Sequence, residues 1–312
     1  MNLLAEYLLL AVAVFNVSTA SILVRLSGVH GFVAATWRLV FSALLTLGLV
    51  LVSTKLRSEV RRIRRRDALL MVVSGIMLAL HFDLWMTSLQ HLSVAASVTI
   101  VDSYPAVLAI VGYTLFKERY TGLQLVGAGV AILGIALLSL HSASGGIVPP
   151  GGDPLLGVAT SFSGMLAVAA YFSIGKEVRS RLSTATYTGI VYASGAVFSG
   201  AATLMLGKPL TGFEAETWAY LALLAILPML GGHTVINYLL SKLSLLASTA
   251  PILGEPVGAS ILAKIVLDEP VDPGTAVYMV VTLTGIGMVI AGERRRLGSA
   301  EAKAITPDQA VT

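Results

Sequence analysis

Five ionisable side chains lie inside long apolar stretches of this chain and are the residues best placed to do chemistry there: Arg38, Asp83, Asp102, Glu255 and Lys264. A charge at the centre of a bilayer costs roughly 2.5–3.5 kcal/mol on insertion scales. Such residues normally mark a transport pathway, a proton site or an ion pair. The five therefore predict binding or proton-transfer chemistry inside a membrane.

Arg38 offers a planar fork of hydrogen-bond donors, which suits a substrate carboxylate. Its alternative role is to pair with Asp83 or Asp102 for structural reasons. Either carboxyl group can take a substrate ammonium or a proton, or can serve only as the partner of Arg38. His81 and Trp85 are four residues apart and share a helix face, whereas Asp83 points about 200° away from His81.

Glu255 is the candidate for proton coupling, because a buried carboxyl group in apolar surroundings favours its neutral form. A role in helix packing is the alternative. One arginine cannot neutralise three carboxylates, so at least one should be protonated or paired with substrate, and Glu255 has no cation close to it in sequence. Lys264 has a long stem that can carry its charge to the membrane interface.

Other polar and aromatic side chains in apolar stretches are candidates to complete a substrate-binding cavity. Aromatic rings there can stack on a planar substrate, although packing is the commoner role of such rings. The candidates are Asn16, Trp85, Tyr104, His233 and Asn237.

Two prolines, Pro105 and Pro256, are predicted hinges. Each removes a backbone donor and frees the carbonyl group four residues earlier, which is that of Val101 or Ile252. In a membrane, a freed carbonyl group must face protein or water. Both prolines therefore point to a cavity or to a bend.

The elements that carry these residues have the length and composition of membrane spans. The chain is 56% hydrophobic and 12% charged, about half the charge of a soluble domain, and about 20 apolar residues span a bilayer core. We predict an all-α integral membrane protein with ten transmembrane helices, at residues 5–24, 31–53, 68–90, 93–116, 121–140, 155–175, 184–206, 217–240, 244–267 and 273–292.

The chain also repeats itself at an offset of 151 residues. Pro105 returns as Pro256 and Glu118 as Glu269. We interpret the two glutamates as caps of helix starts, where a carboxylate meets free N–H groups and the positive end of the helix dipole. The predicted domains are a five-helix repeat at 1–141, a Gly/Pro-rich linker at 142–154, a second repeat at 155–292 and a cytoplasmic tail at 293–312.

Because five is an odd number, the second repeat should be inverted in the membrane relative to the first. Inverted repeats are typical of secondary transporters, which bind substrate at the repeat interface. With the N-terminus inside, 17 of the 21 Lys and Arg residues face the cytoplasm, the exceptions being Arg25, Arg38, Lys208 and Lys264. Both termini are therefore predicted to be cytoplasmic, in a multi-pass protein of the plasma membrane.

The repeated unit resembles the EamA domain of the drug/metabolite transporter superfamily. The resemblance rests on small residues followed by Pro, an apolar stretch, Glu and a Gly-rich helix in each half, and on the pairs Trp37–Arg38 and Glu255–Pro256. It covers almost the whole chain and implies a transporter, but not a substrate, since relatives export amino acids, other metabolites or drugs. Asp102 departs from the family pattern, which favours a neutral residue there.

We expect a secondary transporter that exports small metabolites, amino acids or related zwitterions, by alternating access. An uncoupled facilitator or a multidrug exporter is the alternative. An intramembrane enzyme is disfavoured because no HExxH or GxSxG motif occurs, and no Walker motif indicates ATP binding. We expect no cofactor and no metal; the chain has no cysteine to serve as a thiolate ligand.

The expected partners are a small-molecule substrate and the lipid bilayer, with no nucleic acid. The basic run Lys55–Arg66 is interpreted as a topology anchor rather than as a patch that binds anionic lipid or nucleic acid. Small residues such as Gly127, Gly134 and Gly285 permit close helix packing, within one chain or between two. A monomer or a weak homodimer is expected.

Overall fold

The computed structural model describes residues 3–115, 117, 120–144, 147–241, 245–249, 252 and 254–305, and the regular elements in this part of the chain are helices. The first half contains α1 (Leu3–Ser18), α2 (Ala20–Ser27), α3 (Gly31–Val52), α4 (Thr54–Val60), α5 (Arg65–Ser88), α6 (Val94–Val101), α7 (Tyr104–Thr114) and α8 (Gly122–Ala143). The second half contains α9 (Pro154–Arg179), α10 (Thr184–Met205), α11 (Ala215–Leu224), the π-helix η1 (Ala225–Thr234), α12 (Val235–Leu240), α13 (Leu245–Thr249), α14 (Glu255–Leu267) and α15 (Pro273–Ile305).

Eight of the ten predicted spans correspond to described helical segments that are long and apolar enough to cross a membrane. The other two differ from the prediction. Residues 244–267 are divided between α13 and α14, and the apolar part of α15 is a shorter stretch, Pro273–Val289. The predicted tail at 293–312 continues α15 as far as Ile305.

Several helix starts follow from polar caps in the sequence. Ser93 accepts a hydrogen bond from the backbone N–H of Ala96 at the start of α6. Asp153 accepts from the first two N–H donors of α9, which begins with Pro154. Such caps satisfy N–H groups that have no partner within the helix, so helix boundaries fall at the predicted loops.

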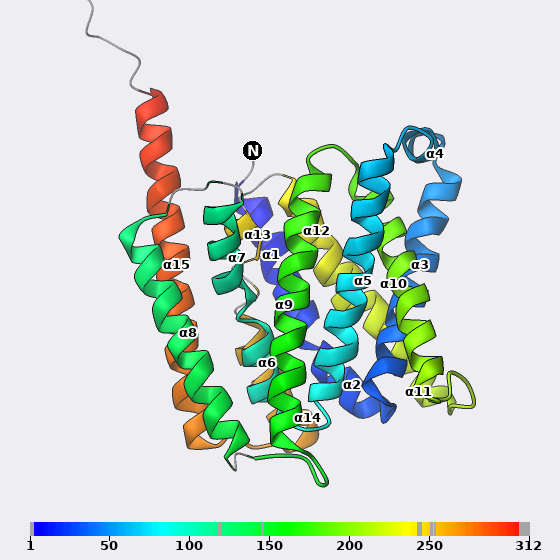
Figure 1. Cartoon of the computed structure of the whole chain (residues 1–312), viewed down its shortest axis with the longest axis vertical. Helices are drawn as coiled ribbons and strands as arrows, with labels where there is room; N and C mark the ends of the chain where they lie inside the picture. Colours follow the sequence, from blue (N-terminus) through cyan, green and yellow to red (C-terminus); the bar gives the residue numbers. More distant parts are fainter. Residues whose placement is uncertain are drawn as a thin grey trace, which may run out of the picture.

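The molecule is a bundle with two distinguishable ends (Figure 1). We call the upper end in that view the terminal end, because the start of α1 and the C-terminal part of α15 lie there, together with α4. The lower end, which carries the connections α8–α9, α10–α11 and α14–α15, is called the far end. An even number of crossings places both ends of a chain on the same side.

The two halves contact each other at the terminal end through polar side chains. Asp67, at the start of α5, lies 2.7 Å from Arg181, which follows α9. The Glu59 carboxylate of α4 accepts hydrogen bonds from the Ser183 and Thr186 hydroxyl groups. Burial raises the pKa of Glu59, but these hydrogen bonds outweigh burial, and its pKa lies below the ordinary value.

Helices α8 and α15 form a closely packed pair at one side of the bundle (Figure 1). A Cβ atom at Gly127 would lie 2.5 Å from the carbonyl oxygen of Gly285, and one at Gly285 would collide with the backbone nitrogen of Ala131. The small residues predicted to permit close packing therefore do so within the chain, between the last helix of each half.

Candidate functional site

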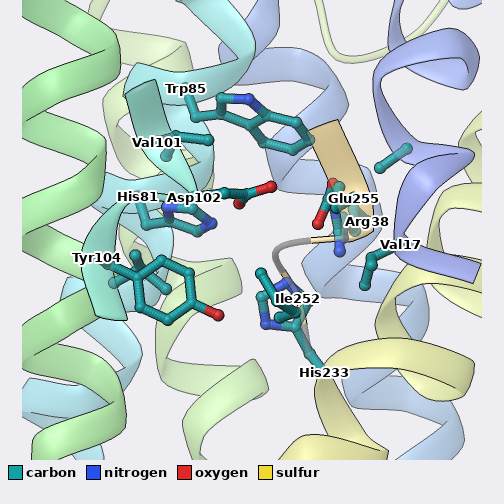
Figure 2. A pocket seen from close by; sticks show the side chains of 12 residues that line it. Val17, Arg38, His81, Trp85, Val101, Asp102, Tyr104, His233, Ile252 and Glu255 are labelled. Atoms are coloured by element: carbon teal, nitrogen blue, oxygen red, sulfur yellow. The ribbon is translucent and has the colours of Figure 1, made fainter. Parts of the chain in front are cut away.

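A small cavity lies at the centre of the bundle, where elements of both halves meet. It has room of only ≈ 10 Å³ for the centre of a water-sized sphere, about what one water molecule needs. The cavity as it stands is therefore no larger than a water site. Twelve residues line the cavity (Figure 2): Val17, Ala20, Arg38, His81, Trp85, Val101, Asp102, Tyr104, Val168, His233, Ile252 and Glu255.

Helix breaks position the two carboxyl groups of the cavity. Asp102 is the residue at which α6 ends, and Pro105 lies in the first turn of α7. Glu255 is the first residue of α14, and Pro256 follows it. The two predicted hinge prolines thus stand at matched breaks in the two halves, which is the arrangement that transporters use at midplane binding sites.

The carboxyl groups of Asp102 and Glu255 line the same cavity. Figure 2 shows the Asp102 side chain pointing across the cavity toward Glu255. Two carboxylates cannot hydrogen-bond to each other unless one of them carries a proton, because a carboxylate only accepts hydrogen bonds.

Arg38 of α3 is 1% exposed and provides the guanidinium of the site. Its Cζ atom lies 4.0 Å from the centre of the Phe82 ring, a cation–π contact, and the group interacts electrostatically with Glu255. Within the described part of the chain, its Nε and Nη1 atoms have no hydrogen-bond partner.

Four further polar atoms at the cavity lack a hydrogen-bond partner among the described residues: Trp85 Nε1, Asp102 Oδ2, the Tyr104 hydroxyl and His233 Nδ1. Buried polar atoms are normally paired with protein or water. Unpaired atoms gathered around one cavity, together with Arg38, indicate a site that receives a polar ligand.

Aromatic rings form much of the wall. The His81 and Trp85 rings are stacked with centroids 5.9 Å apart and an angle of 6° between their planes. The Phe172 and His233 rings are stacked in the same way, 6.0 Å apart at 4°. His233 belongs to η1, a π-helix that contains Pro228; π-helical turns are rare and are frequent at functional sites.

Three predicted binding residues lie outside the cavity. Asp83 faces the other side of α5 and accepts a hydrogen bond of 2.6 Å from Ser199 of α10. Asn16 packs against Gly231 of η1. The Asn237 amide donates to the carbonyl oxygen of His233 and to the Tyr171 hydroxyl.

The positions of these three have a common reason. Sequence depth places a residue in the membrane but does not say which neighbour its helix face meets. The structure separates Asp83 from the face that carries His81 and Trp85, as expected. Asp83 lies two residues from each of them along α5, so its side chain points to a different helix, α10.

Several lining residues were not among the predicted site residues. His81 was recognised as sharing the face of Trp85, and that i, i+4 spacing is a signal that includes it in the site. Val17, Ala20 and Val168 are small or medium apolar residues in apolar helices, and nothing in their type distinguishes them from packing residues. Lys264 lies at the far end, where its Nζ atom is 2.7 Å from Asp268.

Of the two repeated glutamates, Glu269 does cap a helix, but not its own. It accepts a hydrogen bond from the backbone N–H of Val94, at the start of α6 in the other half. Glu118 lies outside the described residues.

Comparison with known proteins agrees with this architecture. The sequence model of the EamA-like transporter family matches residues 4–140 and 155–291. No curated protein matches the chain. Among solved structures, one described as "Crystal structure of protein" is similar to this chain, with a TM-score of 0.68 and 16% sequence identity. The similarity covers 93% of this chain and 99% of the chain in that structure. At that identity the likeness shows a shared fold. The family match covers both halves at the spacing of the repeat, and the chain therefore belongs to the EamA-like transporter family.

Proposed function

We propose that this membrane transporter is a secondary transporter that exports small metabolites, amino acids or related zwitterions, from the cytoplasm. The observation that carries the proposal is the central cavity, in which donors of Arg38 without a partner among the described residues and the carboxyl groups of Asp102 and Glu255 face the same space. A zwitterion presents one group to each.

Binding would use opposite charges at the two sides of the cavity. The Arg38 guanidinium, which has free donors among the described residues, would clamp the substrate carboxylate. The carboxyl pair would take the substrate ammonium. Tyr104, Trp85 and His233 would complete the hydrogen bonds and would pack against the substrate side chain.

Coupling to protons follows from the carboxyl pair. The pair would hold a proton when no substrate is bound, because two carboxyl groups that face each other in a buried cavity repel each other when both are charged. A substrate ammonium group can replace that proton as the partner of the pair. The ammonium group and the proton would compete for the same carboxyl oxygens. Proton and substrate would therefore occupy the pair in turn, which is the basis of exchange. Glu255 is the proposed proton carrier.

The proposed architecture is ten spans in two inverted five-helix repeats, with both termini and α4 in the cytoplasm. Figure 1 supports it in that these segments share one end of the molecule. Alternating access would open the cavity to each side in turn, with bending at Pro105 and Pro256. The working unit would be a monomer or a weak homodimer in the plasma membrane.

The experiment is flux of labelled amino acids into proteoliposomes that contain the purified protein, with and without an imposed pH gradient. Gradient-driven accumulation of at least one amino acid is expected. Flux that only equilibrates would indicate an uncoupled facilitator, and flux of bulky organic cations but not of amino acids would indicate a multidrug exporter. Flux equal to that of protein-free vesicles for every solute would contradict a transport role.

A further inference from the structure

Three short helices lie between the cavity and the far end. Each has one end at the cavity: α2 begins with Ala20, α6 ends at Val101 beside Asp102, and α14 begins with Glu255. Figure 1 shows α2, α6 and α14 in the lower half of the molecule. Helix α14 packs against both α2 and α6, so these three helices form one packed group beside the cavity.

The ends of these helices away from the cavity are tied together by one ionic cluster. The Nη2 atom of Arg25, near the end of α2, lies 3.4 Å from Oε2 of Glu269, which follows α14. The same nitrogen donates a hydrogen bond of 2.8 Å to the carbonyl oxygen of Leu92. The backbone N–H of Val94, at the start of α6, donates to Oε1 of Glu269 at 2.5 Å.

The cluster joins the two halves of the chain. Glu269 comes from the second half, whereas Arg25, Leu92 and Val94 come from the first. The carboxylate also meets the positive end of the α6 dipole, which stabilises it there. Helix α6 runs from Val94 to Val101 and ends at Asp102, so it connects this cluster to one carboxyl group of the cavity.

The cluster is suited to opening as well as to closing. The side chains of Arg25 and Glu269 are 21% and 15% exposed, so protein encloses neither of them completely. Both lie at an end of the bundle, where the proposed topology places water that could hydrate the separated charges. A partly exposed ion pair is weak enough to break during a transport cycle.

We propose that Arg25 and Glu269 form the gate of the far end: they are paired in this structure and separate when the cavity opens to that side. The proposal rests on the proposed function, because a gate has meaning only if a solute crosses. The repeat offset relates Arg25 to Lys176 at the terminal end, where Lys176 donates to the carbonyl oxygen of Leu240. A basic residue that binds a backbone carbonyl thus recurs in the other half.

The competing explanation is that Glu269 only caps α6. Two substitutions separate the roles. Glu269→Gln keeps an oxygen that can accept from Val94 and removes the charge that binds Arg25. Arg25→Gln leaves the Glu269 carboxylate on Val94 and removes the guanidinium. Both variants should therefore fold, and their thermal unfolding in detergent is measured first.

The test uses Val101→Cys as a reporter in the cavity, since the chain has no other cysteine. Intact cells are treated from outside with a membrane-impermeant thiol reagent, and the rate of labelling is measured. We expect a roughly two- to fivefold faster rate with Glu269→Gln or Arg25→Gln, as expected for loss of a partly exposed ion pair. The matched control is Lys264→Gln, which breaks the neighbouring exposed pair with Asp268 and should leave the rate unchanged.

Equal labelling rates in the parent protein, Glu269→Gln and Arg25→Gln would overturn the gate and leave the capping role. If Glu269→Gln does not fold, Arg25→Gln decides alone, because its cap is intact. The labelling needs no substrate. A gate-dependent rate without flux of any amino acid would therefore reject the proposed substrate class and retain the gate.

Discussion

In the proposed site, one cation and one carboxyl pair divide the work of binding. Arg38 is 1% exposed, and two of its donor atoms have no hydrogen-bond partner among the described residues. A proton shared by Asp102 and Glu255 would lower their joint charge, so that the proposed site is near neutrality without substrate and gains paired charges when a zwitterion enters.

Replacement of Arg38 by Ala should abolish transport of carboxylate substrates while the protein still inserts. The lost charge-assisted hydrogen bonds correspond to a roughly tenfold to hundredfold fall in affinity, measured as substrate-dependent flux in proteoliposomes. The control is Lys208→Gln, in the loop between α10 and α11. It removes one cation at a residue that does not line the cavity, and this variant should transport normally. Normal flux with Arg38→Ala would reject the clamp, and failure to insert would favour a structural role.

Replacement of Glu255 by Gln should preserve substrate binding but remove the dependence of flux on a proton gradient. An amide still forms a hydrogen bond to Asp102 but cannot release a proton. The measurement is flux at equal internal and external pH and with an imposed gradient. Glu216→Gln is the control, since Glu216 is exposed at the far end in α11. If wild-type flux does not respond to the gradient, coupling through Glu255 is wrong.

At the scale of elements, the broken helices are what bring the site together. The sequence predicted hinges at Pro105 and Pro256 because proline removes a backbone donor, and both prolines lie in the first turn of a helix, α7 or α14. It could not predict the π-helix that carries His233, since no local pattern specifies the wider turn. Nor could it show that Glu269 caps α6, because that contact joins residues 175 apart.

The packing of α8 on α15 gives a prediction with a built-in control. Gly285→Ala would place a Cβ atom against the Ala131 backbone, whereas Gly287 has no atom within 4 Å of such a Cβ. Overpacking costs about 1–3 kcal/mol, and alanine is intrinsically favoured in helices. Gly285→Ala should therefore lower the unfolding temperature in detergent, and Gly287→Ala should leave it unchanged or higher. Equal effects would contradict the described helix contact.

At the scale of the whole molecule, composition and the repeat predicted the class and most of the spans. Membrane-spanning segments can be recognised in a sequence because a helix in lipid must be apolar along its whole length. The cavity needs helix rotation and the meeting of two halves, which composition does not encode. Among the candidate residues, the structure brings six together around one cavity and leaves three outside it. Those at the cavity are Arg38, Trp85, Asp102, Tyr104, His233 and Glu255, and those outside are Asp83, Asn16 and Asn237.

The orientation of the molecule is open to a direct test at Ser58 in α4, which is exposed at the terminal end. With Ser58→Cys in this cysteine-free chain, an impermeant thiol reagent should label lysed cells and not intact cells. Thr211→Cys, in the exposed connection at the far end, should be labelled in intact cells. Labelling of Ser58→Cys from outside intact cells would reverse the proposed topology.

The measurement that tests the central claim most directly compares three forms of one transported amino acid in proteoliposomes: the zwitterion, its ester without the carboxylate and its N-acetyl derivative without the ammonium. Recognition by Arg38 on one side and by Asp102 with Glu255 on the other predicts that only the zwitterion competes strongly with labelled substrate. It also predicts that Arg38→Ala abolishes the preference for the zwitterion over the ester. Equal competition by all three forms would contradict a site that binds both charged groups.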